Sequence, residues 1–136
     1  MYKSTGYLNY HHSYWLTLEV DQGITDFYRA LIPKYLYPQQ QKYPAHITII
    51  RPERELPKNL KFWGKYHKQS VEFYYDPEIV IGHKFFWLNA FSTRLEQVRE
   101  ELGLPIVDGY KVAPEGFNKF FHLTVANRKY DQIVLR

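Results

Sequence analysis

The chain contains no cysteine among its 136 residues. That absence excludes a disulfide framework, a thiolate nucleophile, and any zinc or iron–sulfur site built on cysteine ligands. Long apolar runs are missing too: no stretch approaches the roughly 18 residues of a membrane-spanning helix, and residues 1–7 lack the apolar segment of a signal peptide. We therefore expect a soluble protein that stays in the cytoplasm of the cell in which it is made.

The charge is only mildly biased. Lys and Arg number 18 against 14 Asp and Glu, which gives a net charge of +4. The basic residues are scattered, so the sequence predicts neither a membrane-binding segment nor an arm for long nucleic acids. What is abundant is aromatic: 18% of the chain, with 13 tyrosines. Abundant tyrosine favours half-exposed rings that offer flat faces to a partner, and the charge favours a small anionic one.

Hydrophobic periodicity predicts strands and helices along one domain, residues 1–136. The expected strands are 14–20, 45–50, 71–75, 78–82, 84–90, 120–126 and a short one at 133–135. The expected helices are 24–31, capped by Asp21 or Thr25, and 93–102, opened by a capping box of Thr93 and Glu96. Two similar strand–helix–strand units predict an α+β fold with pseudo-twofold symmetry.

Two of the expected strands carry the same short pattern. The first reads His46-Ile47-Thr48-Ile49 and the second His122-Leu123-Thr124-Val125. With six histidines and six threonines in the chain, chance is a poor explanation for this repeat. Because side chains at i and i+2 of a strand point the same way, each motif places an imidazole and a hydroxyl on one face and anchors the other face in the core.

Paired His-x-Thr motifs suit cleavage of a phosphodiester. One neutral imidazole can accept the proton of the attacking group while a second, protonated, donates one to the leaving oxygen. Threonine hydroxyls can donate hydrogen bonds to the nonbridging oxygens in the transition state. The residues do not say which of His46 and His122 is the acid. They call for no metal and no other cofactor, since each motif offers a single metal ligand.

Tandem motifs of this form, 76 residues apart, resemble the signature of the 2H phosphoesterase superfamily. Within it, four segments look like the anti-CBASS protein 1 nucleases of phages, which degrade the cyclic oligonucleotide messengers of a bacterial immune system. The similar segments are residues 6–16, 28–33, 46–52 and 122–127.

The resemblance implies two pseudo-symmetric lobes whose antiparallel sheets form a central cleft. It implies metal-independent hydrolysis of 3′-5′ bonds in cyclic di- and trinucleotides, in a host-cell cytoplasm, with His46, Thr48, His122 and Thr124 as catalytic residues. Tyr14 corresponds to a tyrosine that lies against a base, and Trp87 is the candidate for a stacking tryptophan. An acidic residue that assists the site in relatives has no clear counterpart, since Asp131 is the sole acid after His122.

Other residues near the motifs are candidates for substrate contact. Lys42 and Arg51 bracket the first motif, and Tyr110 lies in the loop before the second. Each is as readily explained as solvated surface. The remaining histidines fall outside the repeated pattern and are expected at the surface: His11, His12, His67 and His83.

Two other functions stay open at this point. One is RNA processing by a 2′,3′-cyclic phosphodiesterase of the 2′-5′ RNA ligase type. The other is a non-catalytic module that sequesters nucleotides, for which the duplicated His-x-Thr motif would be unnecessary. Base preference, ring size, oligomeric state and the identity of the nucleophile, water or a ribose 2′-hydroxyl, are not determined by the sequence.

Overall fold

The computed structural model describes residues 1–109 and 111–129. Its strands are β1 (Tyr2–Tyr10), β2 (Leu16–Glu19), β3 (Pro38–Gln39), β4 (His46–Ile50), β5 (Ser70–Ile81), β6 (Phe85–Phe91) and β7 (Phe121–Arg128). The helices are α1 (Gln22–Leu31) and α2 (Thr93–Glu101), with short 3-10 turns at His12–Tyr14, Lys34–Leu36 and Leu60–Phe62. The expected strand at 133–135 lies outside the described residues.

The strands form a closed barrel, and the expected two-lobed α+β fold with a central cleft is wrong. Six strands follow one another in the order β7-β4-β2-β1-β5-β6, and β6 pairs back onto β7. Every pair is antiparallel, and the short β3 adds to the end of β7. Two lobes would need two separate sheets, whereas here β1 joins β2 to β5 and so merges them into one ring.

Strand β1 was not expected, and its composition explains why. Its inward positions include Gly6 beside Leu8, so the alternation of apolar and polar residues is weak. A Cβ at Gly6 would lie 2.5 Å from the Glu19 carbonyl oxygen and 2.7 Å from Leu18 Cγ, so only glycine allows β2 to approach this closely. The residue that obscures the strand in the sequence is therefore one that its pairing requires.

The expected strands 71–75 and 78–82 are one continuous strand, β5. Its pairing with β6 shifts register between Tyr75 and Ile79, and this irregularity accommodates Pro77, which has no N–H for the ladder. β5 is therefore long enough to pair with β1 through its first half and with β6 from Tyr74 to Ile81. The sequence predicts a turn here because Asp76 and Pro77 are turn-prone residues.

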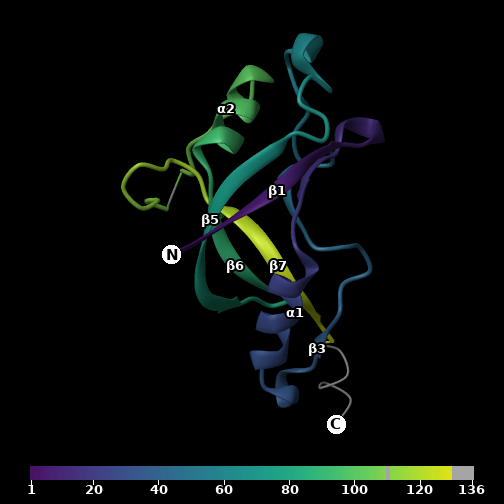
Figure 1. Ribbon diagram of the computed structural model, residues 1–136, viewed down its shortest axis with the longest axis vertical. Coiled ribbons are helices and arrows are strands. Elements are labelled where there is room, and N and C mark those ends of the chain that lie inside the picture. Colours follow the sequence, from purple (N-terminus) through teal and green to yellow (C-terminus); the bar gives the residue numbers. More distant parts are fainter. Residues whose placement is uncertain (110, 130–136) are drawn as a thin grey trace.

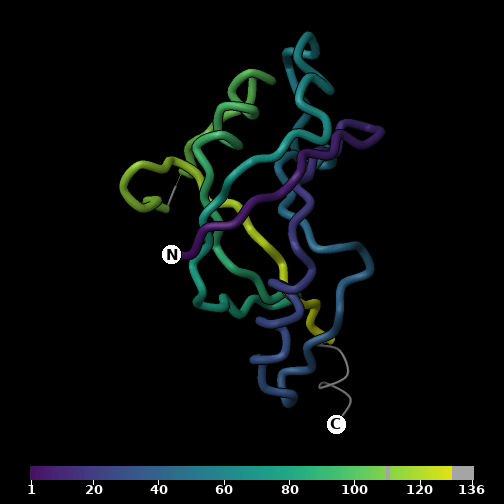
Figure 2. The backbone as a smooth tube through the Cα atoms, in the orientation of Figure 1, coloured from purple at the N-terminus to yellow at the C-terminus, as the bar shows by residue number. Residues whose placement is uncertain are grey.

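The barrel interior is filled by side chains from every main strand, and the helices close its ends. The inward-facing residues that are 0–1% exposed include Leu8, Leu16, Leu18, Ile47, Phe73, Phe86, Leu88 and Leu123. Figures 1 and 2 show α1 and α2 at opposite ends of the strands. α1 adds Tyr28 to this core, and α2 adds Leu95 and Val98. Neither helix, within the part of the chain described, is long and apolar enough to cross a membrane.

Both helices begin on a side-chain cap. Asp21 Oδ1 accepts the Gly23 N–H at 2.9 Å, as expected for α1. For α2 the expected capping box is wrong: the cap is Ser92, whose hydroxyl accepts the Leu95 N–H at 3.2 Å. Glu96 turns away because it accepts hydrogen bonds from the backbone and side chain of Asn118. That contact ties α2 to the segment that leads into β7.

Arg99 of α2 is the largest polar group inside the fold. It is 1% exposed and donates to the carbonyl oxygens of Ile49 and Pro105 and to both carboxylate oxygens of Glu55. The Arg99 guanidinium lowers the pKa of the Glu55 carboxyl through hydrogen bonds and charge. Because Ile49 follows Thr48 in β4, this ion pair fixes the strand that carries the first His-x-Thr motif.

Replacing Glu55 with alanine is expected to lower the free energy of unfolding by about 2 to 4 kcal/mol, since it leaves the buried Arg99 charge without its partner. Urea denaturation at neutral pH measures this. Glu53→Ala is the matched control: Glu53 is exposed, lies 3.9 Å from Arg51, and should cost at most about 1 kcal/mol. Because the pKa of Glu55 is lowered, the difference between the two variants should shrink as the pH falls. Equal losses in both at neutral pH would contradict the argument.

Candidate active site

The two His-x-Thr motifs lie on neighbouring strands with their polar side chains on the outer face of the barrel. Strand β4 carries one motif and β7 the other, and Ile47 pairs with Leu123 between them. Both of these residues are buried in the barrel interior, as the sequence predicts. Antiparallel register around that pair sets His46 opposite Thr124, and Thr48 opposite His122. Each imidazole therefore faces a hydroxyl from the other strand.

The outer face continues in two rows across five strands. One row joins the site to β2 and β1 through Thr48, Thr17 and Asn9, which are successive cross-strand partners. On the other side of Thr48, the same row continues through His122 of β7 to its cross-strand partner Asn89 of β6. The second row contains Tyr7, Glu19, His46, Thr124 and Trp87, again as successive partners about the Ile47–Leu123 pair. The two motifs thus form the centre of a polar surface rather than an isolated pair.

His46 is held in one tautomer and in one orientation. Its Nδ1 lies 2.7 Å from the Pro44 carbonyl oxygen, which can only accept, so Nδ1 carries the proton of this bond. The edge of Trp15 packs against the ring, with 5.9 Å between ring centroids. The Nε2 atom is consequently the one that can exchange a proton with a substrate.

Desolvation of the His122 ring, and then the positive charges near it, lower the pKa of this histidine. The pKa of His122 is lowered, to about 4, chiefly because neighbouring atoms displace water from the ring, and next because of the positive charge of Lys111. Lys119 and Arg51 lower it further, while Asp108 opposes them. Part of the residue still reaches solvent, which reduces the cost of charging the ring. His122 is neutral at neutral pH, and an anion beside it would be attracted by three cations.

Trp87 stacks on His122. The ring centroids are 4.8 Å apart with 27° between the planes, and the indole N–H donates to the Asn89 side chain at 3.2 Å. Gly82 makes this placement possible, because a Cβ there would lie 2.4 Å from the indole Cζ3 atom. Trp87 therefore lies at the motifs, in direct contact with a catalytic candidate, and its stacking on a base stays a prediction.

The other substrate-binding candidates are dispersed. Tyr14 lies in the turn between β1 and β2, has a φ of +64° and is 38% exposed. Its ring packs edge-to-face with the ring of Trp63, with 5.2 Å between the ring centroids. Lys42 is exposed, with its ammonium 5.7 Å from the centroid of the neighbouring Tyr43 ring. Arg51 is exposed near Glu53, and its positive charge helps to lower the pKa of His122. Tyr110, like Asp131, lies outside the described residues.

His11 is the residue that sequence reasoning missed. It was expected at the surface, yet it is half-buried, and its Nε2 shares a 2.9 Å hydrogen bond with the Thr17 hydroxyl. Its ring stacks on Trp15 at 4.1 Å, and Trp15 in turn contacts His46. The pKa of His11 is lowered, chiefly by burial. No sequence pattern marks it, because its position depends on how β1 and β2 pair.

Comparisons with known proteins assign no family to the chain. No protein-family model, curated protein or solved structure matches the chain. In the described residues, no group of three or more His, Asp or Glu side chains is placed to hold a metal ion. The arrangement offers two imidazoles in different electrostatic surroundings, two hydroxyls and a positive neighbourhood around His122.

The imidazole of His122 is expected to titrate below its ordinary value of roughly 6.5, and Lys111→Gln should raise its midpoint because it removes the nearest opposing charge. Two-dimensional NMR of the histidine ring protons against pH measures both quantities. Lys34→Gln, in the turn after α1, serves as the control and should leave the midpoint unchanged. A wild-type midpoint at or above 6.5, or one that Lys111→Gln does not move, would refute the description of this site.

Proposed function

We propose that the protein is a phosphodiesterase that hydrolyses the 3′-5′ bonds of cyclic di- and trinucleotides without a metal ion. The observation that carries the proposal is the pairing of Ile47 with Leu123, which sets each motif histidine opposite the threonine of the other motif. Such an arrangement supplies an acid, a base and two hydroxyl donors around one phosphate. A binding module would need no such duplication.

His122 acts as the base and His46 as the acid in this scheme. A neutral His122 accepts the proton of the attacking hydroxyl, whose oxygen forms the new bond to phosphorus. The bond from phosphorus to the 3′ oxygen breaks, and that oxygen takes the Nε2 proton of His46, which must enter the step as an imidazolium and leaves it neutral with its Nδ1 proton still donated to the Pro44 carbonyl. The Pro44 carbonyl keeps the His46 ring aimed throughout, because it holds the opposite nitrogen. The attacking hydroxyl belongs to water in the hydrolysis proposed here.

Hydroxyl groups and cations near the motifs stabilise the negative charge of the phosphate. The hydroxyls of Thr48 and Thr124 donate to the nonbridging oxygens as negative charge develops. Lys111, Lys119 and Arg51, which disfavour a proton on His122 in the free protein, stabilise an anion placed against it. A bound phosphate therefore also raises the proton affinity of His122 at the moment it must accept one.

The 2H phosphoesterases, and the phage anti-CBASS nucleases among them, remain the group that the motifs resemble. The proposal takes its substrate class from that resemblance and its chemistry from the site. It does not rest on the fold, because the barrel differs from the two-lobed fold that the resemblance implied. With such a substrate the protein would help a phage evade bacterial CBASS defence.

Incubation with a panel of cyclic di- and trinucleotides in EDTA is expected to give linear products, which mass spectrometry identifies by mass and phosphate end. His46→Ala and His122→Ala should each lower kcat by about 10²- to 10⁴-fold, and Thr48→Val or Thr124→Val by about 10²- to 10³-fold. Tyr35→Ala is the control, because Tyr35 is exposed in the 3-10 turn that follows α1 and belongs to neither motif. Full activity in either motif-histidine variant would overturn the proposal.

The same assay separates the competing functions. Faster turnover of RNA with a 2′,3′-cyclic phosphate end than of any cyclic oligonucleotide would assign the protein to RNA processing. Tight binding with the ligand recovered intact would assign it to sequestration. A substrate with 2′-deoxyribose identifies the nucleophile: it is cleaved if water attacks and resists cleavage if the ribose hydroxyl does.

The acidic limb of the pH profile of kcat/KM is expected below pH 6.5, because the base must be neutral and the pKa of His122 is lowered. Activity should therefore rise with pH through that lowered value. Lys111→Gln should move this limb to higher pH, in step with the midpoint seen by NMR. A limb that stays in place while the NMR midpoint moves would show that His122 is not the base.

A further inference from the structure

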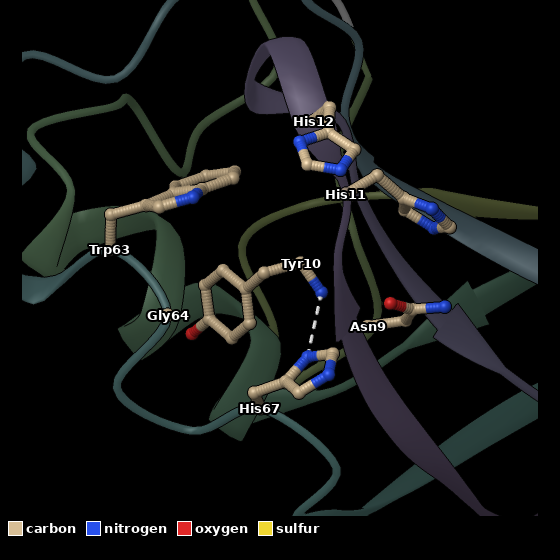
Figure 3. Close-up of a pocket in the computed structure, with 7 residues that line it drawn as sticks. All are labelled: Asn9, Tyr10, His11, His12, Trp63, Gly64 and His67. Atoms are coloured by element: carbon tan, nitrogen blue, oxygen red, sulfur yellow. Dashed lines mark hydrogen bonds between the residues drawn. The ribbon is translucent and has the colours of Figure 1, made fainter.

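An open pocket of about 650 Å³ lies beside the site, at the turn between β1 and β2. Figure 3 shows the side chains around it, and Figure 2 shows that this turn lies at the same end of the molecule as the segment around residue 63. The pocket is lined by Asn9, Tyr10, His11, His12, Trp63, Gly64 and His67. None of these residues belongs to the two His-x-Thr motifs.

The two walls of the pocket are joined by hydrogen bonds. Leu8 of β1 accepts the Lys68 N–H at 2.7 Å and donates to the Gln69 carbonyl at 3.0 Å. The Tyr10 N–H donates to His67 Nδ1 at 3.2 Å, so the proton of the neutral His67 ring sits on Nε2. The pocket is therefore a built feature of the fold, and His67 brings a hydrogen-bond donor to it.

The pocket lies two strands away from the first His-x-Thr motif. Asn9 is the cross-strand partner of Thr17, and Thr17 is the partner of Thr48. Two strand spacings amount to about 10 Å, a separation that one nucleoside can bridge between its phosphate and its base. His11 connects the two regions a second time, because it lines the pocket and shares a hydrogen bond with Thr17.

The lining fits a nucleobase better than a phosphate. Trp63 provides a large aromatic surface, held by the edge contact of Tyr10 at 5.0 Å. The Asn9 amide donates to Glu19 through Nδ2, which leaves its Oδ1 to accept, and His67 supplies a donor. Among the described residues, the pocket lining contains no Lys, Arg, Asp or Glu. A flat ring with donors and acceptors at its edge matches these groups, whereas the cations that suit a phosphate surround His122.

We propose that this pocket binds a nucleobase of the cyclic oligonucleotide, the one attached to the nucleoside next to the cleaved phosphate. The inference rests on the proposed function and adds a base subsite on Trp63, whose ring also contacts Tyr14 and which is distinct from the surface of Trp87. Stacking on the indole supplies affinity, and Asn9 and His67 read the edge of the base.

Trp63→Leu tests this subsite, because leucine keeps apolar volume against Tyr10 and removes the stacking surface. The expected result is a KM for a cyclic dinucleotide raised about tenfold or more, with little change in kcat. The KM for methyl 4-nitrophenyl phosphate, which carries no nucleobase, should not change. Phe62→Leu is the matched control, since Phe62 is the neighbouring aromatic, half-buried against the core and outside the pocket.

His67→Ala is the second variant, because its side chain is exposed and its loss leaves the core intact. It should raise the KM for the cyclic dinucleotide by a smaller factor, and again not for the small diester. Equal KM values in wild type, Trp63→Leu and His67→Ala would overturn the subsite and leave the proposed function standing. If wild type cleaves neither substrate, the proposed function fails, and calorimetry with the intact cyclic dinucleotide then decides the pocket: binding weakened by Trp63→Leu supports it, and unchanged or absent binding refutes it.

Discussion

The pairing of Ile47 with Leu123 is the contact on which both the fold and the candidate site depend. It joins β4 to β7 and so closes six strands into a ring. The same contact decides which side chains face each other on the outer surface. A shift of either strand by one residue would turn that strand's histidine inward and expose its buried aliphatic residue instead. The hydrophobic core therefore fixes the register of β4 and β7, and this register determines which motif side chains lie opposite each other.

The local features of this arrangement were readable in the sequence. Alternation in residues 45–50 and 120–126 predicts the strands that carry the motifs, and it predicts that Ile47 and Val125 are buried while the histidines face away from the core. The amphipathic pattern of α1 and its Asp21 cap were equally plain. Each of these depends on residues within a few positions of one another, which is the range over which periodicity is informative.

The pairing between distant strands could not be read in the same way. Closure requires β1 to lie between β2 and β5, yet Gly6 weakens the pattern that would have revealed it. His11 and Trp63 belong to the site region only because that pairing brings the first hairpin and the segment around residue 63 together. Nothing in their immediate neighbours distinguishes them from ordinary surface residues. The fold-level resemblance failed for the same reason, since short motifs constrain two strands and leave the other connections open.

The β4–β7 seam differs from the rest of the barrel in one respect. Within the described chain these strands share one paired position, Ile47 with Leu123, whereas each other junction of the ring has four or more. A junction with so few hydrogen bonds opens at lower free energy than its neighbours. Local breathing of the ring should thus concentrate along the line between His46 and His122. Such opening would change the spacing of the two imidazoles while the other five junctions stay intact.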